Sequence, residues 1–269
     1  MTVETPGRLL DEMRERAPLV QCITNFVAMN VAANVLLAAG ASPAMVHSTE
    51  ESGDFAKVAG ALTVNIGTLS PDWLAGMRAA ALAANDAGRP WVLDPVAHQA
   101  TAFRRRAVAE LLDLGPAIVR GNASEIIALA GGKSRAPGMD SRDAVAGAEA
   151  AALALARTRG PVTAVTGETD FATDGSRWVR IAGGSPLMPK VTALGCSLTC
   201  LVGAFAAIRP QDPLAATVAA LGLFAVAGER AARDAAGPGS FAWRFLDELA
   251  ALDGTALDAA VRIESGAAS

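Results

Sequence analysis

One cysteine stands at the predicted start of a helix, where reactive groups meet anions. Residues 191–200 read VTALGCSLTC, a turn of small residues that opens an apolar helix and places Cys196 on its first turn. The first N–H groups of a helix have no acceptor within it and bind phosphates and oxyanions. This environment favours the thiolate of a cysteine, whereas a thiol buried in mid-helix is inert packing. Gly195 and Cys196 are therefore the leading candidates for catalysis.

Polar side chains lie at the ends of three predicted strands. They are Asp94, Arg120, Asn122, Glu125 and Thr166. In open α/β sheets the ligand binds beyond the carboxyl ends of the strands. Two carboxylates, a guanidinium and an anion-binding helix start are the groups that Mg²⁺-assisted phosphoryl transfer requires. The pattern predicts a site for that chemistry.

Most of these residues also have a structural interpretation. Asn122 can cap a helix, with Glu125 three positions later completing a capping box. Asp94 and Arg120 can form an ion pair at the end of a sheet. Their occurrence at successive strand ends, together with the helix start described above, favours a functional site.

Short apolar runs that alternate with longer Ala-rich stretches indicate the elements that position these groups. Strands are expected over residues 19–23, 44–46, 62–66, 91–93, 117–119 and 162–165. The alternation is typical of βαβ units, with a mostly parallel sheet and helices on both faces. Residues 171–173 and 178–181, joined around Asp174-Gly175, predict a hairpin and therefore an antiparallel sheet edge. After Gly195 the chain is expected to be almost entirely helical, chiefly over 196–207, 214–232 and 241–251.

Composition excludes several classes of protein. The chain has 269 residues and no linker, so we expect a single domain over 1–269. Its net charge is −4 and neither sign is clustered, which argues against nucleic acid and for a small-molecule substrate. Neither a dinucleotide-binding GxGxxG after the first strand nor a P-loop motif is present. The two histidines, His47 and His98, have no zinc-ligand spacing to a cysteine.

The remaining features indicate location and assembly. Three cysteines without a leader segment predict a reducing cytoplasm, with Cys22 and Cys200 as core thiols. Residues 17–49 and 191–208 carry no charged side chains. Polar residues interrupt the first, and the second begins with a turn that leaves too short a helix to span a bilayer. We expect no membrane span and instead helices buried against copies of the same chain.

The motifs resemble one known family. Asn122-Ala123-Ser124-Glu125 is similar to the Asn-x-x-Glu motif of the ribokinase superfamily, and Gly195-Cys196 stands in place of its Gly-Asp pair. A cysteine there is typical of the hydroxyethylthiazole kinases. Further blocks similar to that family, in its order, are residues 21–25, 33–38, 40–45, 65–69, 93–96 and 120–125.

The resemblance implies a three-layer ribokinase-like α/β fold and a homotrimer with sites at subunit boundaries. It also implies ATP-dependent phosphorylation of the hydroxyl of 5-(2-hydroxyethyl)-4-methylthiazole, in thiamine biosynthesis or salvage. The site residues that it implies are Asp94 and Glu125 for Mg²⁺, Arg120, Thr166 and Asn122 for ATP, Gly195 and Cys196 for catalysis, and Met45, Asn25, Gly67, Thr68 and Ala193 for the substrate.

One position departs from the family pattern. The family usually reads Thr-Gly-x-Gly-Cys, whereas this chain has Ala193 at the first glycine. Alanine adopts a positive φ less easily than glycine, so substrate affinity depends on the backbone conformation of Ala193.

Other functions remain open at this level. They are a same-fold nucleotide-dependent dehydratase of hydrated nicotinamide cofactors, a catalytically silent small-molecule-binding trimer, and a hydroxymethylpyrimidine kinase. Cys196 argues against the dehydratase, which resembles the Gly-Asp form. The silent trimer is expected to lack Asp94, Glu125 or Arg120, and all three are present.

Overall fold

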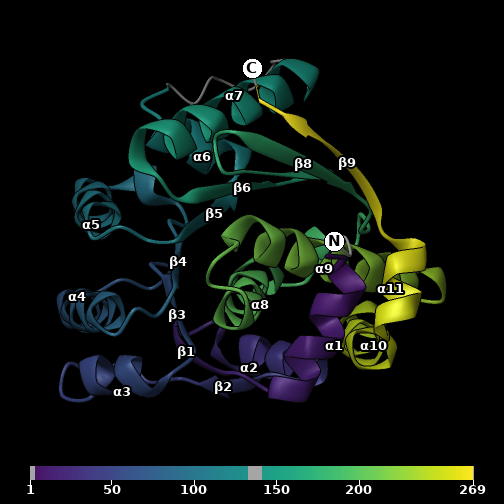
Figure 1. Ribbon diagram of the computed structural model, residues 1–269, viewed down its shortest axis with the longest axis horizontal. Helices are drawn as coiled ribbons and strands as arrows, with labels where there is room; N and C mark the ends of the chain where they lie inside the picture. The colour runs from purple at the N-terminus through teal and green to yellow at the C-terminus, as the bar shows by residue number, and fades with distance from the viewer. Residues whose placement is uncertain (1–3, 133–140, 269) are drawn as a thin grey trace.

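The computed structural model describes residues 4–132 and 141–268 and arranges them around one nine-stranded sheet (Figure 1). The strand order is β2-β1-β3-β4-β5-β6-β7-β8-β9, and neighbours are parallel from β2 to β6 and antiparallel from β6 to β9. The strands are β1 (Leu19–Ile23), β2 (Ser42–Ala44), β3 (Ala61–Asn65), β4 (Trp91–Asp94), β5 (Ile118–Asn122), β6 (Val162–Thr166), β7 (Thr169–Thr173), β8 (Arg177–Ala182) and β9 (Arg262–Ala267).

Helices cover both faces of the sheet and make three layers, as predicted (Figure 1). One face carries α3 (Ser52–Val58), α4 (Pro71–Asp86), α5 (Ala102–Asp113), α6 (Ala123–Leu129) and α7 (Ser141–Arg159). The other carries α1 (Pro6–Arg16), α2 (Met29–Ala39), α8 (Leu194–Ile208), α9 (Pro213–Arg233), α10 (Pro238–Ala251) and α11 (Gly254–Ala260). Each face has its own buried core, centred on Trp91 and Met77 on the first and on Phe205 and Phe245 on the second.

Most strand boundaries differ from the expected ones by one to three residues, and strand pairing explains the differences in β2 and β5. β2 ends at Ala44 rather than beginning there, because Ser42 and Pro43 pair with β1. Proline is tolerated in β2 because this strand lies at the edge of the sheet. β5 extends to Asn122, because its last residues pair in register with β6 up to Thr166.

The expectation that the chain is almost entirely helical after Gly195 was wrong at its end. β9 (Arg262–Ala267) pairs antiparallel with β8 and forms the other edge of the sheet. The strand is largely exposed, with Ile263 40% exposed, so it carries no apolar alternation that a sequence pattern could reveal. The predicted hairpin is confirmed, with Gly175 at a φ of 89° in the turn between β7 and β8.

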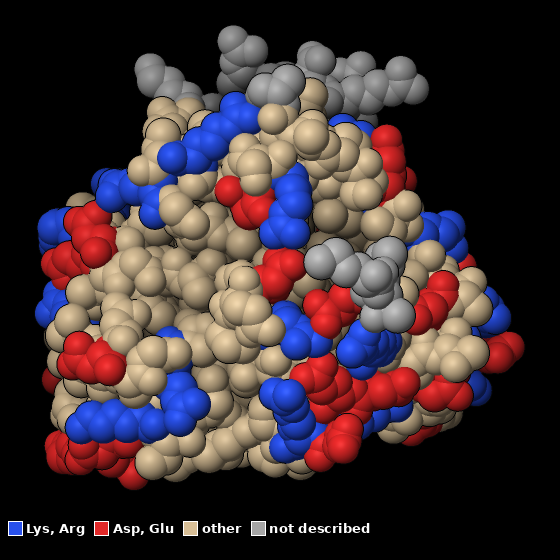
Figure 2. All heavy atoms as spheres, in the orientation of Figure 1, with Lys and Arg blue, Asp and Glu red and all other residues tan. Residues whose placement is uncertain are grey.

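Charged side chains are mixed on the surface. On the face drawn in Figure 2, acidic and basic residues lie next to one another without a broad area of one sign. Helix α9 is long and apolar enough to cross a membrane, but 83% of its most apolar window is buried within the protein. Its apolar composition is therefore explained by packing between α8 and α10, as Cys22 and Cys200 are explained by burial in the same core.

Candidate active site

Helix α8 begins at Leu194, two residues before the expected start, and Cys196 is its third residue and lies on the first turn as predicted. Ala193 is the N-cap, and the first helical hydrogen bond runs from the Ser197 N–H to the Ala193 carbonyl at 2.9 Å. The N–H groups of residues 194–196 precede that bond and are free to face a ligand. Gly195 is exposed, and a Cβ there would lie 3.3 Å from the Arg120 guanidinium. The glycine therefore lets the helix start and the arginine approach each other closely.

Ala193 adopts the conformation that was in question. Its φ is 65° and its ψ is 1°, in the left-handed region that favours glycine. The chain therefore keeps a glycine-like backbone at this position despite the added methyl group. An alanine in this region costs about 1–2 kcal/mol, so the helix start carries local strain.

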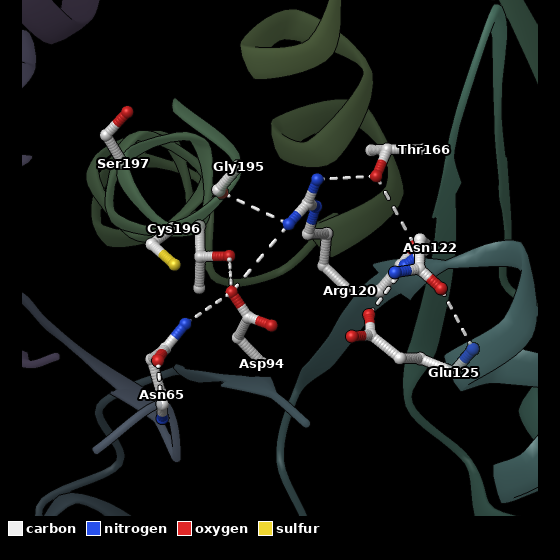
Figure 3. Close-up of polar contacts among 12 residues, drawn as sticks. Asn65, Asp94, Arg120, Asn122, Glu125, Thr166, Gly195, Cys196 and Ser197 are labelled. Carbon is white, nitrogen blue, oxygen red and sulfur yellow. Dashed lines mark hydrogen bonds and ion pairs between the residues drawn. The ribbon is translucent and has the colours of Figure 1, made fainter. Parts of the chain in front are cut away.

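Arg120 joins the helix start to the strand ends (Figure 3). Its guanidinium donates to the Gly195 carbonyl at 3.1 Å and to the Thr166 hydroxyl, and it lies 3.7 Å from the Asp94 carboxylate. The side chain is 8% exposed, and Arg120 lies in β5 two residues before the strand ends at Asn122. The predicted convergence of three strand ends on the start of α8 is confirmed.

Asp94 is a buried carboxylate with one unsatisfied oxygen. Its Oδ2 accepts from Asn65 Nδ2 at 2.7 Å and from Thr199 Oγ1 at 2.8 Å. Its Oδ1 has no hydrogen-bond partner among the described residues. Burial raises the pKa of Asp94 to about 6, with Glu125 adding to the increase and Arg120 opposing it. This buried oxygen is therefore available to accept from or coordinate a ligand.

Glu125 and Asn122 form the capping box that the sequence allowed. The Asn122 side chain accepts from the Glu125 N–H at 3.0 Å, and Glu125 Oε2 accepts from the Asn122 N–H at 2.9 Å. Glu125 Oε1 also accepts from the Ala97 N–H, which follows β4, at 2.8 Å. The structural interpretation of this pair is therefore confirmed. The same bonds also hold the Glu125 carboxylate on the side of β5 that carries Asp94.

Four of the five predicted substrate residues, all except Ala193, follow β1, β2 or β3 by one to three residues. Asn25 Nδ2 contacts Cys196 Sγ at 3.3 Å and donates to Asn65 Oδ1 at 2.8 Å. A Cβ on Gly67 would come within 2.6 Å of the Asn25 amide, so only glycine allows this approach. The Thr68 hydroxyl accepts from the Phe26 N–H at 3.1 Å.

Met45 directly follows β2, the neighbour of β1. It is half-buried and packs against the core that contains α8. The contacts described above connect Asn25 to Gly67 and Cys196, and Thr68 to the backbone of Phe26, which follows Asn25. Met45 is placed by its strand alone.

The Cys196 thiol is neutral, which corrects the expectation of a favoured thiolate. Burial raises the pKa of Cys196 to about 11, and the nearby Asp94 carboxylate adds to the increase. The hydrogen bond from Asn25 and the charge of Arg120 lower the pKa of Cys196 but do not offset these effects. The group is therefore a protonated thiol near neutral pH rather than a nucleophile or a strong base.

The sequence interpretation overlooked three residues of this network. Asn65 bonds to Asn25, Gly67 and Asp94, and Thr199 bonds to Asp94 from the second turn of α8. Arg104 of α5 donates to carbonyl groups of the loops after β3 and β4. Asn65 is a polar residue at the end of a buried strand, so the sequence could have indicated it as a site residue. Nothing in the sequence indicates Arg104, because its partners Ile66 and Gly67 are distant along the chain.

Comparison with known proteins agrees with this geometry. A model described as the hydroxyethylthiazole kinase family matches residues 10–255. The hydroxyethylthiazole kinase of Rhizobium rhizogenes is 71% identical over 261 residues, which are 97% of each chain. That of Rhizobium johnstonii is 70% identical over 264 residues, covering 98% of this chain and 99% of the relative.

Solved structures lead to the same family. The hydroxyethylthiazole kinase of Pyrococcus horikoshii OT3 superposes with a TM-score of 0.89 at 38% identity, covering 97% of this chain and 98% of that one. The pyridoxal kinase of Staphylococcus aureus in complex with AMP-PCP and pyridoxal shares the fold alone, with a TM-score of 0.63 at 16% identity over 93% and 99% of the two chains. With a ribokinase-like sheet, a cysteine at the helix start and relatives of near-equal length, the chain belongs to the hydroxyethylthiazole kinase family.

Proposed function

We propose that this enzyme transfers the γ-phosphoryl group of ATP to the hydroxyl of 5-(2-hydroxyethyl)-4-methylthiazole, a step of thiamine biosynthesis or salvage. Membership of the family, and relatives that are named hydroxyethylthiazole kinases, support this assignment. The observation that carries it is the start of α8, which has free N–H groups and the neutral Cys196 thiol. On one side this helix start contacts Arg120, and on the other side it contacts Asn25.

The nucleotide binds on the side of β5 and β6. Arg120 supplies a buried cation for the phosphates, and its bond to the Thr166 hydroxyl holds the guanidinium in place. Asn122 lies at the N-terminus of α6, where its exposed side chain borders the same strand ends. The transferring phosphoryl group meets the free N–H groups at the start of α8, which stabilise negative charge.

The carboxylates fit a magnesium ion held mainly through water and phosphate oxygens. No cluster of three or more acidic, histidine or cysteine ligands occurs in the described part of the chain, so a fully protein-made site is not supported. Asp94 Oδ1 is the free buried oxygen, and Glu125 adds negative charge nearby. Mg²⁺ prefers such oxygen ligands and retains water, and when bound it neutralises charge on the phosphates.

The acceptor alcohol binds between Asn25, Gly67-Thr68 and Met45, with its hydroxyl near Cys196. A loose phosphoryl-transfer transition state needs little proton transfer, so alignment and charge neutralisation contribute most of the acceleration. A neutral thiol suits that requirement, because it can contact the hydroxyl without adding negative charge. Ala193, at the opening of the same helix, contributes backbone contacts to this substrate.

The assembly that we propose is a homotrimer in the cytoplasm, with residues 1–269 forming one domain. Phe26 and Val27 directly follow Asn25 and are 66% and 57% exposed, and Leu37 of α2 is 62% exposed. Apolar surface beside the acceptor site is suited to burial by a second copy. The single sheet formed by residues 19–267, as far as they are described, supports one domain.

An acceptor panel tests the function. ADP release is coupled to a dehydrogenase readout with MgATP and one of three additions: hydroxyethylthiazole, hydroxymethylpyrimidine or no acceptor. We expect release that depends on the thiazole alcohol. Release with the pyrimidine alone would establish the rival kinase, and absence of release with either would favour a silent binding protein or an altered acceptor.

A further inference from the structure

One arginine outside the strand ends holds two of their loops together. Arg104 lies on the first turn of α5, half-buried behind the site. Its Nη1 donates to the carbonyl of Ile66 at 2.8 Å and to the carbonyl of Val96 at 3.0 Å, and its Nη2 donates to the carbonyl of Gly67. Two of these acceptors belong to the turn that follows β3, and the third belongs to the loop that follows β4.

The turn after β3 is fixed from both sides. The Ile66 carbonyl points to Arg104, and the N–H of the same peptide, on Gly67, donates to Asn65 Oδ1 at 2.9 Å. A trans peptide directs its carbonyl and N–H to opposite sides, so the two partners together fix the orientation of this plane. Gly67 packs in turn against Asn25, which contacts Cys196.

The loop after β4 is fixed in the same way. Val96 lies two residues after Asp94, and the next residue, Ala97, donates its N–H to Glu125. The guanidinium of Arg104 therefore joins the Gly67-Thr68 turn to the loop after β4. That loop directly follows Asp94 and bonds to Glu125 through the Ala97 N–H. These two loops must keep a fixed separation if the alcohol is to lie in line with the phosphoryl group, since small displacements of reacting groups are costly.

The helix itself gives no reason for an arginine at this position. Arg104 is the third residue of α5, where the partial positive charge of the helix N-terminus disfavours cations and favours acids. The neighbouring Arg105 bonds to the carbonyl of Gln99, six residues away on the same segment. The Arg104 partners at Ile66 and Gly67 lie 38 and 37 residues away, so its contacts are between loops and not within the helix.

We propose that Arg104 is a positioning residue for the acceptor, one that sets the placement of the Gly67-Thr68 turn relative to Asp94 and thereby the affinity and alignment of the alcohol. The inference rests on the proposed function. It assigns Arg104 no contact with either substrate. A lysine cannot replace the arginine, because a single ammonium lacks the planar fork that reaches all three carbonyl groups.

Steady-state kinetics of Arg104→Ala, Arg104→Lys and the control Arg105→Ala test the proposal. We expect KM for the thiazole alcohol to rise about tenfold in both Arg104 variants with a fall in kcat, and KM for ATP to stay within about twofold, because the nucleotide contacts lie on β5 and β6. Added methylguanidinium should partly restore Arg104→Ala and leave the lysine variant unchanged. Arg105→Ala should match wild type.

Other outcomes overturn the proposal. They are wild-type kinetics in Arg104→Ala, equal increases in KM for both substrates, or a loss of activity that follows a lowered melting temperature and resists rescue. If Arg104→Ala is poorly folded, the kinetics of Arg104→Lys test the proposal, because this variant keeps the positive charge and the aliphatic part of the side chain. Calorimetric binding of the alcohol to folded variants repeats the comparison without turnover. Lack of any thiazole-dependent ADP release by wild type would instead reject the proposed function.

Discussion

The alanine at the opening of α8 provides a sharp test of the geometry of the site. Ala193 has a φ of 65°, a conformation in which its Cβ is close to the neighbouring carbonyl oxygen. Changing Ala193 to glycine removes that contact and leaves the backbone where it is. The strain relieved is about 1–2 kcal/mol, and the extra freedom of glycine in the unfolded chain offsets about 0.4–1 kcal/mol of it.

The expected net effect is a stabilisation of roughly 0.5–1 kcal/mol. For a chain of this size that corresponds to an increase in Tm of about 2 °C, measured by calorimetry or circular dichroism. Because the backbone already has the conformation that glycine prefers, KM for the alcohol should stay within about twofold of wild type. The change therefore separates stability from binding.

Ala17→Gly is the matched control. Ala17 also has a positive φ, 41°, but it is the C-cap of α1 and is not among the site residues. Both variants should gain stability, and neither should change KM. A lowered melting temperature in Ala193→Gly would refute the argument from strain, and a large change in KM would show that the methyl group itself contacts the substrate.

Three further substitutions test the roles of single residues. Cys196→Ala should lower kcat about tenfold, less than the hundredfold or more that is lost with a strong general base, and wild-type kcat would remove the thiol from the mechanism. Gly67→Ala, whose Cβ would lie 2.6 Å from the Asn25 amide, should raise KM for the alcohol about tenfold, whereas Gly239→Ala, with no neighbour within 4 Å, should not. Because the folded pKa of Asp94, about 6, lies above its unfolded value, wild type loses stability as pH rises from about 4 to 6. Asp94→Asn avoids that loss, so the melting temperature of the variant should exceed that of wild type at pH 7.5 and converge with it near pH 4. The variant should be inactive. A melting temperature below that of wild type at pH 7.5 would contradict this reasoning.

Local patterns were sufficient for the core of the fold. The mostly apolar run at residues 19–23 became β1 without change, because a parallel strand between two neighbours is buried on both faces. The small-residue turn before Cys196 correctly placed that residue on the first turn of α8, although the helix begins two residues earlier than expected. The convergence of Asp94, Arg120 and Thr166 followed from the rule that parallel strands end at the same edge.

Features that depend on distant partners could not be predicted in this way. β9 is exposed and recognisable only through its pairing with β8. The pKa of Cys196 follows from burial and a carboxylate that only the fold places beside the helix start. Two of the bonds of Arg104 reach carbonyl groups that lie 38 and 37 residues away in the sequence.

The most direct test of the central claim is identification of the product. Wild-type enzyme is incubated with MgATP and hydroxyethylthiazole, and the mixture is analysed by phosphorus NMR and mass spectrometry. The account predicts a phosphate ester on the hydroxyethyl oxygen, formed in equal amount to ADP and absent with Asp94→Asn. ADP without the ester, or an ester formed equally well by Asp94→Asn, would contradict it.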